Sequence, residues 1–237
     1  MSHVRTLRVT RSELPAGVTA IPVRTPLVSP GDDLVALILR SVHGIARPGD
    51  VVAVSETAVA IAQGELLAAE RVRPSRLAFA IARRADPMAT ISQPESIQLV
   101  IDRVGYAKVI YATLLQFAAR LAGLRGAFYR VMGDAVAAFD GYTGTMPPYE
   151  RTIVFAPRDA DGFATSLTRA AGIACTVVDA NDLGKAKVLG SSPGVRRASV
   201  EAALLDNPHG NSDEQTPIVV LKWRGAGANP LLDADSS

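Results

Sequence analysis

The acidic side chains that follow one short apolar run are the part of this sequence best suited to holding a divalent cation. Asp179 and Asp182 come after the run Ile173–Val178, and their spacing of three residues on one turn can direct both carboxylates toward one ion. Mg²⁺ and Mn²⁺ favour such oxygen ligands over thiols. The alternative is an Asx turn, in which Asp and Asn side chains bond nearby backbone without any metal. The pattern thus predicts either a metal site or a capped turn.

Other polar residues with possible chemical roles stand in loops. Asp134 and Asp140 lie in a stretch that contains glycine, and the sequence does not select one of them as a further carboxylate ligand. His209, Asp213 and Glu214 fall in a polar loop before the last apolar run, where a solvated loop is the alternative to a set of ligands or acid–base groups. No serine–histidine–aspartate arrangement, zinc-type spacing or glycine-rich phosphate loop occurs, so those classes of protein are disfavoured.

The composition excludes some partners. With 25 basic and 23 acidic side chains, the charge is nearly balanced, whereas nucleic-acid binding needs clustered Lys and Arg. Apolar residues make up 48% and charged residues 20%, which is typical of a globular protein. Cys175 is the only cysteine, so no intrachain disulfide can form, and its apolar neighbours predict a small buried hydrophobe.

Neither a secretion signal nor a membrane span is expected. The first thirteen residues are polar and basic and lack the apolar core of a signal peptide. The most apolar long stretch, Tyr106–Leu124, carries Lys108, Gln116 and Arg120, and therefore predicts a buried helix rather than a membrane span. We expect a soluble, cytoplasmic protein with small-molecule partners.

Hydrophobic spacing and turn residues predict an α+β fold. Three prolines fix an extended path through Ile21–Pro30, and Asp32 is the expected N-cap of the helix that follows. Residues 57–62 could be a hairpin partner of the strand before them or the start of a loop. Strands are predicted at 51–55, 127–131, 135–139, 152–156, 173–178 and 216–223 and from 187, and helices from Leu34, Pro74, Pro94, Tyr106, Asp159 and Ala198. Residues 1–224 are predicted to form one domain, with 225–237 a disordered tail.

Several motifs together suggest a family. The run Ile21–Leu34 ends in Gly-Asp-Asp-Leu, and Arg47–Thr57 contains Gly-Asp-Val-Val. Further pieces follow at Gln63–Glu65, Ala156–Gly162 and Val177–Gly184. In these segments the chain resembles the coenzyme F420 gamma-glutamyl ligase family, and the first two elements are the most specific part of the match.

The resemblance implies a concrete activity. Enzymes of that family join the amino group of glutamate to a carboxylate of the deazaflavin coenzyme, with GTP as co-substrate and Mg²⁺ or Mn²⁺. A carboxylate is a poor electrophile, so it is first phosphorylated, and the metal neutralises the phosphate charge. The resemblance also implies a mixed sheet and an intertwined homodimer.

The same resemblance assigns nucleotide and metal contacts to nine residues. The nucleotide would contact Ile21, Pro22, Val23, Arg24, Ser55 and Glu56, although Ile21–Arg24 could equally be a rigid strand connection. The metal ligands would be Asp179, Asp182 and Asp134. Asp134 stands in for a ligand of the family's Asn-Ala-Gly element, which this chain lacks.

One departure leaves three hypotheses open. Where the family carries a lysine near the phosphates, this chain has Ala60-Ile61-Ala62, so a positive charge directed at phosphate is lost. The chain could be an active amide ligase, or a homologue that keeps the fold as a binding or regulatory protein. It could also use another phosphate donor, with phosphate contacts from Arg130, Arg151 or Arg158.

Overall fold

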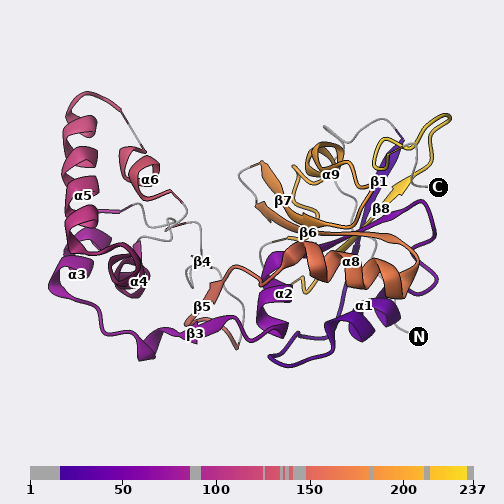
Figure 1. Cartoon of the computed structure of the whole chain (residues 1–237), viewed down its shortest axis with the longest axis horizontal. Coiled ribbons are helices and arrows are strands. Elements are labelled where there is room, and N and C mark those ends of the chain that lie inside the picture. The colour runs from indigo at the N-terminus through magenta and orange to yellow at the C-terminus, as the bar shows by residue number, and fades with distance from the viewer. Residues whose placement is uncertain are drawn as a thin grey trace. The chain divides into compact units, whose positions relative to one another are not determined.

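The chain forms two compact units (Figure 1). The computed structural model describes residues 17–85, 92–124, 126–133, 136, 139–140, 148–181, 184–210 and 214–233. The first unit combines two separate stretches of chain, up to Glu65 and from Pro157 onward, and the second consists of the intervening Leu66–Ala156. Both units lie largely within residues 1–224, for which one domain was predicted, and this domain assignment stays a prediction. The α+β class is confirmed, because helices accompany a sheet in each unit.

The first unit is built on a mixed five-stranded sheet in the order β1-β8-β2-β6-β7. Its strands are β1 Val18–Val23, β2 Val51–Ser55, β6 Ala174–Asn181, β7 Lys185–Ser191 and β8 Ile218–Trp223. β2 and β6 are parallel, and all other neighbours in this sheet are antiparallel. Val51–Val54 and Ile218–Leu221 are at most 1% exposed. Strands buried on both faces read as continuous apolar runs, which is why the sequence predicted both of them.

Helices cover both faces of this sheet. α1 (Leu34–Val42), α2 (Glu56–Ala62) and α8 (Ala160–Ala171) lie on one side, and α9 (Arg197–Ala203) lies on the other (Figure 1). The core on the α9 side is formed by Val18, Val51, Ala53, Val178, Val188, Val195, Val200, Ala203, Leu204, Val219, Leu221 and Leu231. The sheet is thus the middle layer of the unit.

The Pro-rich segment is extended, as predicted. Among the described strands β1 pairs only with β8, with Pro22 opposite Val219. A proline, which has no backbone N–H to donate, is tolerated in such an edge strand. The predicted N-cap of α1 is wrong by one residue. The Asp33 carboxylate accepts from the backbone N–H of Ala36 at 2.9 Å, while Asp32 accepts from Ser29 N at 2.7 Å.

The segment after β2 also differs from the prediction. Residues 57–62 are neither a hairpin partner nor a loop but belong to α2, and Ala58–Ile61 are buried. A short helix that is buried on most sides has no polar stripe, so its period cannot be read from the sequence.

The second unit combines a small antiparallel sheet, in the order β3-β5-β4, with helices. Its elements are β3 Leu66–Ala68, the 3₁₀ helix η1 Ala69–Arg71, α3 Arg76–Ala82, α4 Pro94–Val104, α5 Tyr106–Leu121, α6 Ala127–Met132, β4 Phe139–Asp140 and β5 Thr152–Phe155. The buried core of this unit includes Ile97, Ile101, Phe128, Met132 and Ile153.

The predicted strand at 127–131 is wrong, since these residues lie in α6. The segment Phe-Tyr-Arg-Val favours a strand by composition. Helical geometry places Phe128 and Met132 on one face, and both are buried in the core. The Gln116 side chain on α5 accepts from the Phe128 N–H at 3.0 Å, so a tertiary contact satisfies an amide at the start of the helix.

The predicted helix at 106–124 is confirmed as α5, but the prediction that it is buried is wrong. Only Val109 and Ala112 of α5 are buried, and most of the other apolar side chains of α5 are exposed. In the part of the chain that the structure describes, no helix is long and apolar enough to cross a membrane.

The described part of the C-terminal segment, 225–233, packs on the first unit. Leu231 is buried, and Leu232 forms a β-bridge with Val195. The Asn229 amide donates to the Gly49 carbonyl at 2.7 Å, across the start of β2. Small polar composition predicted a disordered tail over 225–237, whereas Leu231, Leu232 and Asn229 hold the described part of it against the first unit.

Candidate functional site

The first feature of the candidate site is a common edge where several strands end or begin. Because β2 and β6 are parallel, their carboxyl ends meet, and Ser55 pairs with Val178, the residue before Asp179. β8 begins at the same edge, where the Ser55 N–H donates to the Pro217 carbonyl at 2.8 Å. β1 ends there too, and its Val23 pairs with Ile218. Ligands of open α/β sheets often bind beyond the carboxyl ends of parallel strands.

The strand register therefore brings Arg24, Ser55 and Asp179 to the same end of the strands. Their side chains do not all lie on one face of the sheet. Side chains alternate along a strand. Ser55 follows Val51 and Ala53, which pack in the core on the α9 side. Asp179 alternates with Val178 of that same core, so it projects from the α8 side. A ligand that contacts both residues must span the end of the sheet.

The residues predicted to contact nucleotide divide into two groups. Ile21, Pro22 and Val23 are members of β1, and Val23 is buried, so these three build the sheet. Arg24 is exposed just beyond the strand. Ser55 occupies the N-cap position of α2 without a side-chain capping bond, and Glu56 is the first helical residue.

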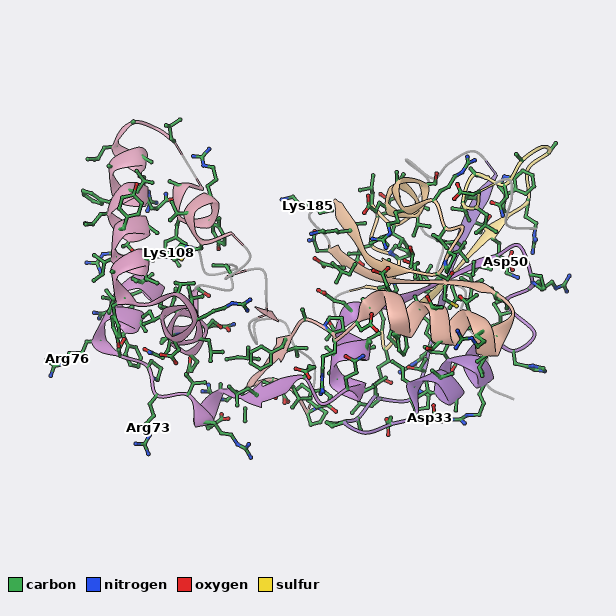
Figure 2. The ribbon with its side chains drawn as sticks, in the orientation of Figure 1. Asp33, Asp50, Arg73, Arg76, Lys108 and Lys185 are labelled. Carbon is green, nitrogen blue, oxygen red and sulfur yellow. The ribbon has the colours of Figure 1, made fainter. Side chains whose placement is uncertain are left out.

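Asp179 lines a hollow at the free end of the β6–β7 hairpin. The hollow has a volume of about 490 Å³ and is lined by Asp179, Asn181, Gly184, Lys185, Ala186, Lys187, Glu201 and Leu205. Burial raises the pKa of the Asp179 carboxyl above its usual value, and the Lys187 ammonium partly offsets this rise. Lys187 pairs with Asp179 across the strands. Lys185, labelled in Figure 2, lies at the start of β7.

Sequence reasoning missed Lys185, Lys187 and Glu201. The sequence signal was the alternation Lys-Ala-Lys directly after the acidic turn. In a hairpin, this alternation places both ammonium groups beside the strand that carries Asp179. Glu201 is tied to the hairpin because its carboxylate accepts from the Val188 N–H at 2.9 Å.

The predicted metal ligands are tested only in part. Asp182 and Asp134 lie outside the described residues, and so does the side chain of Asp140. Within the described ranges no group of three or more His, Cys, Asp or Glu side chains converges on one point. Asp179 has suitable chemistry for Mg²⁺ or Mn²⁺, since it is a half-buried carboxylate at a strand end, but it is only part of a donor set.

The loop between α9 and β8 reaches the same edge and holds a buried histidine. Gln215 accepts from the Thr25 N–H at 2.9 Å, which ties this loop to the end of β1. His209 Nδ1 lies 3.1 Å from the Thr216 carbonyl, which can only accept, so Nδ1 carries the proton. Burial lowers the pKa of His209 to about 4, and its Nε2 atom is buried without a hydrogen-bond partner. The imidazole is therefore neutral at pH 7.

Two of the three arginines considered as substitutes for the missing lysine, Arg151 and Arg158, form ion pairs. Arg158 forms an ion pair with Glu65, and its N–H and Gln63 Oε1 are 2.7 Å apart. Arg151 pairs with Glu70 and with Glu95, the latter at 3.5 Å. Ala60 and Ile61, where the resemblance led us to expect a lysine, are buried in α2. The cations that lie beside Asp179 among the described residues are instead Lys185 and Lys187.

Comparison with known proteins shows the family to which this chain belongs. A family model described as F420-0:Gamma-glutamyl ligase matches residues 22–178, more than half of the chain. The chain belongs to the F420-0:gamma-glutamyl ligase family, a family of carbon–nitrogen ligases.

A curated relative gives the same assignment. The coenzyme F420:L-glutamate ligase of Methanothermobacter thermautotrophicus is 28% identical over 160 residues, which cover 65% of this chain and 55% of the relative. The match thus spans about half the length of that relative.

Proposed function

We propose that this chain is a nucleotide- and divalent-metal-dependent amide ligase that joins an amino acid, glutamate, to a carboxylate through an acyl phosphate. The observation that carries the proposal is the strand register, which brings Arg24, Ser55 and Asp179 of a ligase-family chain to one edge of its sheet. A cation, a hydroxyl and a carboxylate at one edge are the group types that nucleotide and metal binding need.

The proposed reaction has two steps. A carboxylate oxygen of the acceptor attacks the γ-phosphorus of GTP, the bond from phosphorus to the bridging oxygen breaks, and GDP leaves. The amino nitrogen of glutamate then attacks the acyl carbon, and the carbon–oxygen bond breaks to release inorganic phosphate. The nitrogen loses a proton to solvent or to a base. The first step gives the acyl carbon phosphate as a good leaving group in place of oxide, and the second step uses that leaving group, which is why a nucleotide is consumed.

The chain's own residues would orient the reactants at the sheet edge. Arg24 and the Ser55 hydroxyl would contact the nucleotide, and Asp179 with Asp182 and Asp134 would hold Mg²⁺ or Mn²⁺. A bound divalent ion neutralises phosphate charge in such chemistry. It would also offset the burial that raises the pKa of Asp179, so that the carboxylate stays ionised.

The alternative is a homologue that keeps the fold and has a binding or regulatory role. It is favoured by the buried Ala60 and Ile61 in place of a lysine, and by the engagement of Arg151 and Arg158 in ion pairs. A positive charge at the phosphates would then have to come from Lys185 or Lys187, or be absent. The homodimer implied by the family stays a prediction in either case.

Nucleotide binding is the first test of the ligase proposal. We expect GTP with Mg²⁺ or Mn²⁺ to raise the thermal unfolding midpoint relative to buffer, with ATP giving a smaller shift. A ligand present at 100 times its dissociation constant stabilises the folded state by about 2.7 kcal/mol. Scanning fluorimetry with each nucleotide, with and without metal, measures the shift. Absence of a shift with every nucleotide would remove the ligase proposal and leave the binding or regulatory one.

The acidic turn provides the second test. We expect Asp179→Asn and Asp182→Ala to abolish the metal-dependent part of the nucleotide shift while leaving the fold intact. Since burial disfavours the charged form of Asp179, the neutral amide should not lower the midpoint without metal. Asp102→Ala, on α4 in the other unit, is the control carboxylate and should keep the full shift. Loss of folding in the turn variants would instead indicate a capped turn.

A further inference from the structure

The loop between α9 and β8 contacts the ends of both strands that carry the proposed nucleotide residues. In the sheet, β8 lies between β1 and β2, so the chain that enters β8 passes between the ends of its two neighbours. The Gln215 carbonyl accepts from the Thr25 N–H at 2.9 Å, and the Pro217 carbonyl accepts from the Ser55 N–H at 2.8 Å. Because Thr25 directly follows Arg24, one loop holds the backbone beside Arg24 and the backbone of Ser55 itself.

These two contacts lie beyond the ladders of the sheet. Val23 of β1 and Val54 of β2 both pair with Ile218, which is the first residue of β8. Before Ile218 the chain is no longer a strand, so the regular pairing of the sheet does not fix its path. The loop can hold Arg24 and Ser55 in place only if it keeps a fixed shape of its own.

A mutual pair of hydrogen bonds between His209 and Thr216 gives the loop that shape. His209 Nδ1 donates to the Thr216 carbonyl at 3.1 Å, and the Thr216 hydroxyl donates to the His209 carbonyl. Each side chain therefore satisfies the backbone of the other residue. Thr216 stands between Gln215 and Pro217, so the pair fixes the residue that lies between the two carbonyls in contact with the strands.

Stability alone does not account for a histidine at this position. Its Nε2 atom is buried and has no hydrogen-bond partner among the described residues, and a buried polar atom without a partner destabilises the folded state. An apolar side chain of similar size would avoid that cost. Gln215 also has a φ of 53°, in the left-handed region that side chains disfavour. Unfavourable local features of this kind are concentrated where a fold positions functional groups.

We propose that His209 and Thr216 are positioning residues of the nucleotide site. Their mutual hydrogen bonds hold the two flanking carbonyls, which in turn keep Arg24 and Ser55 where a nucleoside triphosphate can contact them. The proposal rests on the proposed function, in which Arg24 and Ser55 are the nucleotide contacts. Neither His209 nor Thr216 needs to touch the ligand. A site that is held in its bound geometry loses less conformational entropy when the ligand binds.

Amide hydrogen exchange of the full chain without nucleotide tests the first part of the proposal. His209→Leu and Thr216→Val remove one partner of the pair and keep a side chain of similar size. In these variants we expect the Thr25 and Ser55 amides to exchange faster by roughly tenfold or more, since their acceptors are released. The amide of Val52, at the centre of β2, reports opening of the whole sheet and should change much less. His209→Asn and Thr216→Ser keep the donors and should resemble the wild type.

Nucleotide affinity tests the second part. Titration calorimetry with GTP and Mg²⁺ is carried out at a temperature at which every variant is folded, so that a loss of stability alone leaves the affinity unchanged. We expect His209→Leu and Thr216→Val to raise the dissociation constant by roughly tenfold or more, the scale of one lost hydrogen bond to a charged group. His209→Asn and Thr216→Ser should restore binding close to that of the wild type.

Two results would overturn the positioning role while the proposed function stands. One is unchanged exchange at Thr25 and Ser55 in both His209→Leu and Thr216→Val. The other is wild-type affinity for GTP in variants whose exchange at these amides is faster. A wild type that binds no nucleotide would instead remove the proposed function, and the positioning role with it.

Discussion

Replacing Gly190 by alanine is expected to destabilise the sheet unit by about 1–3 kcal/mol, the usual range for overpacking a tight site. A Cβ atom at this position of β7 would lie 2.2 Å from the Ala160 carbonyl carbon and 2.4 Å from the Asp161 nitrogen. Both atoms belong to the backbone of the first turn of α8, so no side chain can rotate away. The helix would have to move off the strand.

The cost extends beyond the clash itself. The Asp161 carboxylate accepts from the Ser191 N–H at 2.8 Å and pairs with Arg197 at 2.5 Å, so movement of α8 would disturb contacts to β7 and α9. Urea unfolding followed by circular dichroism measures the loss. The control is Lys185→Ala on the same strand, where an exposed side chain should change stability by less than about 0.5 kcal/mol. An unchanged midpoint for Gly190→Ala would show that α8 does not approach β7 this closely.

Acidification is expected to destabilise the protein through His209. Burial lowers the pKa of this imidazole to about 4, whereas an unfolded histidine titrates near 6.5. Between these values the unfolded chain binds a proton that the folded chain does not, so stability falls as the pH drops from 6.5 toward 4. Below both values the slope from this residue vanishes. The full loss is about 3 kcal/mol, since each pKa unit corresponds to 1.36 kcal/mol.

The variant His209→Asn isolates this effect. An Asn amide can still donate near the position of Nδ1 to the Thr216 carbonyl, but it does not titrate. The free energy of unfolding, measured by urea titration at steps from pH 7 to pH 4.5, should fall less steeply for the variant than for the wild type. The comparison concerns the slope and not the absolute stability, so a uniform packing cost of the substitution does not affect it. Parallel slopes would contradict a neutral buried imidazole.

The sequence was most informative where one local pattern had a single structural solution. The runs at Val51–Ser55 and Ile173–Val178 are too apolar and β-branched for a loop, and both are central strands. It failed at α2 and α6, where β-branched or aromatic residues within short segments are also compatible with a helix. There the decision is made by tertiary contacts, such as the burial of Met132 one turn after Phe128.

The candidate site shows the same division. The acidic turn at Asp179 could be recognised as a possible metal ligand because the residue types and their spacing are local. Asp179 and Ser55 project from opposite faces of the sheet. This arrangement depends on the register between β2 and β6, which lie far apart in the sequence. The pairing of Lys187 with Asp179 depends on the hairpin register, including a bulge between Val177 and Val178. No spacing rule gives either register in advance.

The insertion of the second unit between two halves of the first has a consequence for the rate at which the first unit folds. β2 and β6 must find each other across the whole inserted stretch, and the entropy lost on closing a loop grows with its length. Within the insert, β3 and β5 pair with Leu66 opposite Val154, so its two ends meet once that small sheet has formed. The mutual hydrogen bonds of Gln63 and Arg158 lie just outside these ends. If the insert folds first, its paired ends bring β2 and β6 close together. Only a short loop then has to close before these two strands pair.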